Sequence, residues 1–296
     1  MQRLTPSQLL LLVALTVAWG INWPIMKAGV AGFPPLSFRA LSLWLGIPVL
    51  GLALWAMKVP FRIPRGEGGT HWRELLWLAA TNMFVWHACI ILAVQSLISG
   101  RAAILGYTMP IFSALLGAWL FQNVMPRRGW LGVGAAALGV LLLLWHEFTR
   151  LSGNPQGVVL ALVAAATWAL GTQNLRRTTL PVATLTLSFW MTVMTAVVMT
   201  VLALLFEKPD WRAMPTTTAW AVLFNAVLIF GFAHAAWFHL ARSLPPVAST
   251  LSVMMIPVLG VFSGAWWLGE VLHWQDWAAV GLMVASIATV LWPERR

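Results

Sequence analysis

Charge is scarce in this sequence. Asp, Glu, Lys and Arg make up 9% of the 296 residues, whereas soluble domains carry about 25% charged residues. Cysteine occurs only as Cys89, so a disulfide within the chain is impossible and a CxxC-type metal or redox motif is absent. The low charge excludes an ordinary water-soluble core.

Apolar residues dominate what is present. They make up 60% of the chain, and the mean hydropathy is +0.82. Each charge-free stretch is long enough for the roughly 17–25 residues that cross the hydrocarbon layer, and none alternates as barrel strands do. The ten stretches are 4–26, 40–57, 75–100, 102–126, 129–146, 151–175, 178–206, 213–241, 243–269 and 277–293. We therefore predict an all-α integral membrane protein with ten transmembrane helices.

Basic residues outnumber acidic ones by 18 to 8. They are dispersed around the ends of the apolar stretches and form no patch, so no nucleic-acid partner is predicted. With the N-terminus inside, twelve cations face the cytoplasm: Arg3, Lys58, Arg62, Arg65, Arg73, Arg127, Arg128, Arg176, Arg177, Arg242, Arg295 and Arg296. Five face outwards: Lys27, Arg101, Arg150, Lys208 and Arg212. By the positive-inside rule, both termini are expected in the cytoplasm.

The second half of the chain repeats the first. A shift of 147 positions aligns two sets of residues, which are Ser96, Pro110, Gly117, Trp119 and Gly134 with Ser243, Pro257, Gly264, Trp266 and Gly281. The same shift places His87 on His234, and a shift of 151 places Gly20 on Gly171. Five spans per half, an odd number, force the second half into the opposite orientation. We predict two inverted five-helix repeats, residues 1–148 and 149–296, with a substrate site between them.

The second half also carries a longer motif. Pro257, Gly264, Gly269, Glu270 and Gly281 form the pattern P-x6-G-x4-GE-x10-G. With ten spans and inverted halves, this resembles the EamA-type proteins of the drug/metabolite transporter superfamily. The Trp-rich composition is similar to YddG-type aromatic amino acid exporters of bacterial inner membranes. The resemblance implies export, a bacterial inner-membrane location, and a central cavity walled mainly by the first, third, fourth, sixth, eighth and ninth helices.

Polar and aromatic side chains at membrane depth are the first candidates for a transport pathway, because burying them is costly unless they serve each other or a substrate. His87 and His234 occupy matching places near mid-span, although a lone histidine in an apolar run is usually a satisfied core residue. Asn22 either lines the pathway or bonds a neighbouring helix. The candidate substrate-binding residues are Trp19, Asn22, His87, Tyr107, Trp168, His234 and Trp237. Trp86 is a further candidate for the aromatic wall.

Neither acidic nor basic side chains fall in the middle of a predicted span. Proton-coupled multidrug exporters normally need an intramembrane carboxylate, and phosphate-ester carriers need a central Lys or Arg. The cavity should therefore suit neutral or zwitterionic, partly apolar solutes. Arg39, near the outer end of the second span, has two interpretations: it steers a carboxylate, or it snorkels to the headgroups. A metal site is not predicted, because no HExxH pattern occurs, and no cofactor is predicted.

These observations predict an exporter of neutral amino acids, aromatic and other hydrophobic ones, working by alternating access and facilitative in energy. Its partners are the small-molecule substrate and the lipid bilayer, and a monomer suffices. The helices are expected to hinge at Gly20, Pro24, Pro110 and Pro257. At Pro24, which supplies no backbone donor, the first span is expected to break or kink. Alternatives are a proton-coupled exporter of drugs, quaternary ammonium compounds or metabolites, and, from another class, a channel. An enzyme is not predicted, because no nucleophile–base pair is visible.

Overall fold

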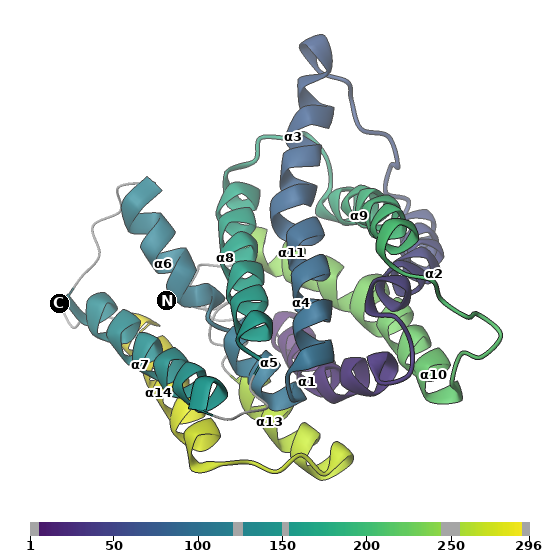
Figure 1. The fold of residues 1–296 in the computed structure, drawn as a ribbon. Coiled ribbons are helices and arrows are strands. Elements are labelled where there is room, and N and C mark those ends of the chain that lie inside the picture. Colours follow the sequence, from purple (N-terminus) through teal and green to yellow (C-terminus); the bar gives the residue numbers. More distant parts are fainter. Residues whose placement is uncertain (1–5, 121–126, 150–153, 244–254, 292–296) are drawn as a thin grey trace.

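The computed structural model describes residues 6–120, 127–149, 154–243 and 255–291, and within these ranges the chain is helical and forms no β-strand (Figure 1). The elements are α1 (Pro6–Val30), α2 (Pro35–Ala56), η1 (Glu67–Gly69), α3 (Thr70–Ala79), η2 (Ala80–Phe84), α4 (Val85–Ser96), α5 (Ser99–Gly106), α6 (Met109–Leu120), α7 (Arg127–Thr149), α8 (Pro155–Arg177), α9 (Thr184–Phe206), α10 (Thr216–Phe224), η3 (Asn225–Ala233), α11 (His234–Ser243), α13 (Met255–Leu268) and α14 (Trp274–Leu291).

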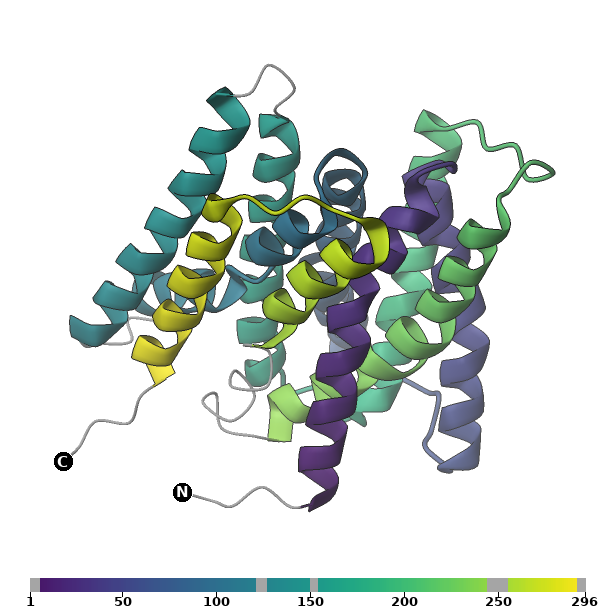
Figure 2. The ribbon, with the colours of Figure 1, turned by 90° about the horizontal axis from the view of Figure 1, so that it is seen from below.

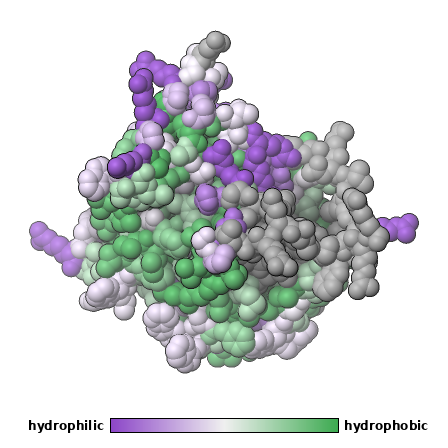
Figure 3. All heavy atoms as spheres, turned by 180° about the vertical axis from the view of Figure 1, so that it is seen from behind, coloured by the Kyte–Doolittle hydropathy of each residue, from purple (hydrophilic) through white to green (hydrophobic). Residues whose placement is uncertain are grey.

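Seven helical segments of the described ranges are long and apolar enough to cross a membrane: Pro6–Val30, Pro35–Ala56, Thr70–Ser96, Ser99–Leu120, Pro155–Arg177, Thr184–Phe206 and Thr216–Arg242. Trp130–Leu143 and Met255–Leu268 are shorter apolar helices. On the face that Figure 3 shows, hydrophobic side chains cover much of the coloured surface, and hydrophilic ones gather towards the end where α3 begins. The predicted all-helical membrane fold is confirmed, while the count of ten spans stays a prediction.

Helices far apart in the sequence pack side by side. The most extensive contacts join α7 with α14, α2 with α9, α1 with α13 and α4 with α8. The α7–α14 pair lies at one side of the bundle, and α1 lies between this pair and α10, in both Figure 1 and Figure 2. The two halves of the chain are therefore interleaved rather than set apart as separate lobes.

Two carboxylates bind helix starts at one end of the bundle. Glu207, just after α9, accepts hydrogen bonds from the backbone N–H groups of Leu36 and Ser37 (2.8 and 2.7 Å) at the start of α2. Glu270, just after α13, accepts from the backbone N–H groups of Ser99 and Gly100 (2.6 and 3.2 Å) at the start of α5. Neither start has a side-chain cap from its own cap residue. Each carboxylate therefore satisfies donors that a helix start leaves open.

Gly269 explains how Glu270 reaches α5. Its φ of +65° is in the left-handed region that favours glycine. This residue ends α13, in the manner common at helix C-termini, and turns the chain so that the next side chain points towards Ser99, whose hydroxyl also donates to Glu270 (2.8 Å). The Gly-Glu pair of the sequence motif is thus a helix stop followed by a cap for another helix.

The repeat-equivalent glycines Gly20 and Gly171 lie where helices approach closely. A Cβ at Gly20 would come 2.6 Å from Cβ of Leu259 on α13, and one at Gly171 would come 2.7 Å from the backbone nitrogen of Asn82 in η2. Small residues permit such close contact between membrane helices. Close packing therefore accounts for both glycines, and the predicted hinge at Gly20 stays a prediction.

Gly171→Ala is expected to destabilise the fold by about 1–3 kcal/mol, because the added methyl group meets backbone that cannot move aside without a helix shift. The measurement is the midpoint of thermal unfolding in detergent, followed by tryptophan fluorescence. Gly134→Ala is the matched control, since a Cβ there meets nothing within 4 Å. Equal midpoints for the two variants would mean that α8 and η2 are not tightly packed at this point.

The predicted hinge prolines differ in their surroundings. Helix α1 continues through Pro24 to Val30, so the helix does not break at Pro24: the missing hydrogen bond is tolerated inside a longer helix. A kink or hinge at Pro24 stays a prediction. The chain is interrupted instead at Tyr107 and Thr108, between α5 and α6, and Pro110 is the second residue of α6. Pro257 is buried near the start of α13.

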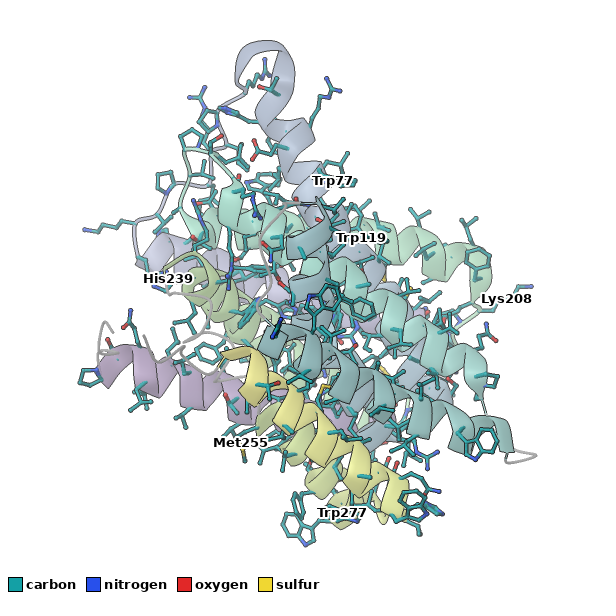
Figure 4. The ribbon with its side chains drawn as sticks, turned by 90° about the vertical axis from the view of Figure 1, so that its left-hand side faces the viewer. Trp77, Trp119, Lys208, His239, Met255 and Trp277 are labelled. Carbon is teal, nitrogen blue, oxygen red and sulfur yellow. The ribbon has the colours of Figure 1, made fainter. Side chains whose placement is uncertain are left out.

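Several tryptophans lie on the periphery. Trp77, Trp119 and Trp277 come from different helices (Figure 4) and are 55%, 87% and 46% exposed. Trp130, Trp145, Trp211 and Trp274 are also exposed. An exposed indole near the end of a membrane helix suits the membrane interface.

Candidate functional site

A small chamber lies within the bundle and has a volume of about 40 Å³. Its wall is formed by Trp19, Asn22, Trp23, Met26, Arg39, Trp86, His87, Ile90, Tyr107, Met109, Trp168, Ile229 and His234. None of these side chains is more than 9% exposed, so solvent has little access from either end. Typical ligand pockets measure about 300–1,000 Å³. The chamber is therefore closed by buried side chains and smaller than a typical ligand pocket.

Two π-helical turns place the histidines. Turn η2 leads into α4, two residues before His87, and η3 ends directly before His234. The widened turn in η3 leaves the carbonyl of Ile229 close to the ring of His234, at 2.9 Å from Nδ1. Because a carbonyl can only accept, Nδ1 donates, and Nε2 of a neutral ring is left as an acceptor. Single π-helical turns are frequent at functional sites, and no residue pattern in the sequence signals them.

The predicted histidine pair comes together. The ring centroids of His87 and His234 are 5.1 Å apart, and both rings pack on Phe230 at 5.1 and 5.2 Å. Both nitrogens of His87 and Nε2 of His234 are buried without a hydrogen-bond partner among the described residues. Three polar nitrogens are thus available in one small space.

Tryptophans enclose the histidines. Trp168 lies 5.0 Å from Trp86, 6.1 Å from Trp19 and 5.6 Å from His234 between ring centroids. Trp23 meets Tyr107 edge-on at 6.1 Å. Edge-to-face packing at these distances is favourable, and it presents ring edges and faces to the interior. The wall suits a planar or apolar group.

Six of the seven predicted substrate-binding residues line this chamber: Trp19, Asn22, His87, Tyr107, Trp168 and His234. Trp237 does not line it and packs instead behind Trp19, at 5.7 Å. The chamber also includes side chains that were not singled out for it, namely Trp23, Met26, Arg39, Ile90, Met109 and Ile229. For the seven residues predicted from the sequence, a role in substrate binding stays a prediction.

Arg39 is the largest departure from the sequence interpretation. Its side chain is 1% exposed and lines the chamber, so the interpretation as a snorkelling residue is wrong, as is the expectation of a centre without a cation. The second span was taken to begin after this charge. Helix α2 in fact begins at Pro35, with Pro34 as its cap residue, which buries Arg39 in the second turn. The Pro-Pro pair was the available signal, because proline favours the first helical position.

The aromatic chamber lies within a bundle of long apolar helices from both halves of the chain, an arrangement that suits a membrane transporter. The model of the EamA-like transporter family matches residues 6–145 and again residues 155–292. The chain belongs to the EamA-like transporter family.

Relatives from bacteria agree with this class. The uncharacterized transporter YoaV of Bacillus subtilis is 25% identical over 87% of this chain and 86% of its own. The uncharacterized inner membrane transporter YedA of Escherichia coli is 28% identical over 94% and 89%. A probable amino-acid metabolite efflux pump of Salmonella typhimurium is 24% identical over 94% and 92%. One crystal structure matches 96% of each chain with a TM-score of 0.70 at 21% identity, which bears on the fold alone.

Proposed function

We propose that this protein exports neutral amino acids with aromatic or other hydrophobic side chains, and related metabolites, across the bacterial inner membrane. The observation that carries the proposal is the closed chamber, whose walls combine tryptophan rings with unpartnered polar atoms. The name of the Salmonella relative, an amino-acid metabolite efflux pump, and the inner-membrane location in the name of YedA support it.

The chamber wall suits the two parts of such a substrate. An apolar side chain would pack on Trp19, Trp86 and Trp168, which supply large apolar faces. The polar end would meet Asn22, whose Oδ1 is buried without a partner, together with Tyr107 and the histidines. At about 40 Å³ the chamber must expand to admit a substrate, so transport requires the helices to move.

That motion would be a rocking of two inverted five-helix repeats, residues 1–148 and 149–296, in a ten-span bundle. The two separate matches to the family model support this division. So does the contact of the end of α9 with the start of α2, and of the end of α13 with the start of α5, since helices related by an inverted repeat run antiparallel. With both termini in the cytoplasm, the end that holds Glu207 and Glu270 faces outwards.

Charge in the chamber weighs against the main alternative. A drug or quaternary ammonium exporter carries a cation, yet no Asp or Glu is among the chamber-lining residues and Arg39 is. The absence of an acid there favours a facilitator that runs down a substrate gradient. Uphill amino acid flux driven only by an imposed pH gradient in proteoliposomes would contradict the facilitator.

The function is tested by counterflow uptake of labelled tryptophan, phenylalanine, leucine and glutamate in proteoliposomes. Uptake is expected for the first three and not for glutamate. His234→Ala and Asn22→Ala are each expected to reduce tryptophan uptake about 3- to 10-fold, the value of a lost hydrogen bond of about 0.5–1.5 kcal/mol.

His239→Ala is the matched control, because His239 is an exposed histidine on the same helix, α11. It is expected to transport like the parent protein. Unchanged uptake in His234→Ala and Asn22→Ala, with all variants folded, would remove these residues from the site. Absence of uptake for every amino acid would remove the function.

A further inference from the structure

We propose that Arg39 binds the carboxylate of the transported molecule, and that the site recognises its substrates by this carboxylate rather than by an ammonium group. Aromatic monocarboxylates that lack an amino group then belong to the substrate class. The inference rests on the proposed function for the place of the chamber in the transport pathway. The observations that carry it concern the surroundings of one buried charge.

The guanidinium of Arg39 has weak partners. Nη1 donates to Oδ1 of Asn225 over a long 3.3 Å, and Nη2 donates to the sulfur of Met26 at 2.9 Å. Nε is buried without a partner. Thioether sulfur is a weak acceptor, and an amide oxygen carries no charge to balance the guanidinium.

No carboxylate compensates this charge. Among the described residues, none lies within 4.0 Å of the Arg39 nitrogens, whereas the other deeply buried arginine, Arg101, bonds Asp276 at 2.7 Å. An uncompensated buried cation is costly. The aromatic face of Phe230, 5.6 Å from the guanidinium carbon, offers a cation–π contact and no counter-charge. A ligand that supplies an anion would complete the site.

Asn225 holds the guanidinium in place. Its Nδ2 donates to the carbonyl of Ala221 at 2.9 Å, which fixes the amide so that Oδ1 faces Nη1 of Arg39. The side chain stands at the first position of η3, the same turn that places His234. An oriented guanidinium can bind a carboxylate with two parallel hydrogen bonds.

An ammonium group would find no comparable partner. The chamber wall contains no Asp or Glu, and its unpartnered acceptors, which include Oδ1 of Asn22 and Nε2 of His234, are uncharged. Tryptophan faces can attract a cation, but Arg39 in the same small chamber repels it. The carboxylate of a substrate would contact the charged Arg39, whereas its ammonium group would contact only uncharged acceptors. Binding therefore requires the carboxylate more than the ammonium group.

The test is competition against counterflow of labelled tryptophan in proteoliposomes. Indole-3-propionate lacks the amino group of tryptophan, and tryptamine lacks its carboxylate. We expect indole-3-propionate to inhibit within about 5-fold of unlabelled tryptophan and tryptamine to be at least 10-fold weaker, since hydrogen bonds to charged groups correspond to roughly 10- to 150-fold in affinity. Tryptamine that inhibits as well as tryptophan would overturn the proposal while leaving amino acid transport in place.

Arg39→Met should raise the half-maximal concentration for tryptophan about 10- to 100-fold and abolish the preference for tryptophan over tryptamine. Lys208→Met is the control and should leave both unchanged, because Lys208 (labelled in Figure 4) is an exposed cation beside the start of α2 and does not line the chamber. A folded Arg39→Met protein that keeps the preference would overturn the proposal. If this variant does not fold, the competition series on the unaltered protein decides by itself.

Labelled indole-3-acetate separates the two proposals. Saturable uptake of this acid, sensitive to Arg39→Met, with no uptake of any amino acid would uphold the carboxylate site and overturn the amino acid function. If tryptophan is taken up, while the acids without an amino group are neither taken up nor inhibit tryptophan uptake, the amino acid function is upheld and the carboxylate site is overturned. Uptake of neither class would overturn both.

Discussion

Asp276→Asn is expected to lower the free energy of unfolding by about 3–5 kcal/mol, the usual cost of removing one partner from a buried ion pair. Oδ1 of Asp276 lies 2.7 Å from Nε of Arg101, and the two side chains are 1% and 8% exposed. The substitution removes the charge with which Asp276 faces the buried guanidinium of Arg101. It also weakens the bond that Oδ2 accepts from the backbone N–H of His273, at 2.8 Å, at the start of α14.

This pair also corrects an expectation from the sequence. Arg101 was counted among the cations of the outer loops, but it lies inside α5, and its partner begins α14. The ion pair therefore joins helices from the two halves of the chain. We expect the thermal midpoint in detergent to fall more for Asp276→Asn than for Gly171→Ala.

Asp210→Asn is the matched control, because Asp210 is exposed and accepts a hydrogen bond only from the nearby backbone N–H of Arg212 among the described contacts. The double variant Arg101→Met, Asp276→Leu should recover most of the lost stability, since an apolar pair can replace a buried ion pair at little cost. A midpoint for Asp276→Asn equal to that of Asp210→Asn would show that water reaches the pair.

Loss of Glu207 or Glu270 is expected to open one end of the bundle. Each carboxylate accepts three hydrogen bonds from the start of another helix, two from backbone N–H groups and one from a serine hydroxyl. In the proposed alternating-access motion, these helices separate when this end opens. A net contribution of about 1.5–3 kcal/mol per carboxylate corresponds to a shift of about 10- to 150-fold in the ratio of closed to open forms.

The measurement is the labelling rate of a single cysteine in the chamber wall. Ile90→Cys, 1% exposed in the closed chamber, is introduced together with Cys89→Ala, which removes the only native thiol. A membrane-impermeant maleimide is added from the side that Glu207 and Glu270 face. Glu207→Gln and Glu270→Gln are each expected to raise the labelling rate in proportion to the open form.

Glu74→Gln is the control for this measurement. Oε1 of Glu74 accepts a hydrogen bond of 2.5 Å from the hydroxyl of Thr178, at the opposite end of the bundle, so its loss should not raise labelling from the first side. If the Glu207 and Glu270 variants are labelled no faster than the parent, these carboxylates only cap helices and do not hold the end closed.

Sequence alone determined the helical membrane character, the repeat and the meeting of His87 with His234. Hydropathy and repeat spacing are read along the chain, and the burial of apolar surface in lipid dictates helices whatever their neighbours. Most of the chamber wall followed too, since polar and aromatic groups at membrane depth must face the interior. Trp237 is the one predicted residue that does not line the chamber, because the ring of Trp19 lies between Trp237 and the chamber.

Tertiary structure decided the electrostatics of the site. Whether the side chain of Arg39 points into the bundle or towards the lipid headgroups depends on where α2 begins and how this helix is rotated about its axis. A charge near the end of a span is compatible with both directions. The shift of 151 places Arg39 on Trp190, which instead bonds the carbonyl of Phe61, so the repeat gave no warning of a central cation. The π-helical turns at η2 and η3 are likewise set by packing, because no local residue pattern requires them. Chain-local patterns fix which segments enter the membrane, whereas the balance of charge inside depends on rotations that only contacts between helices determine.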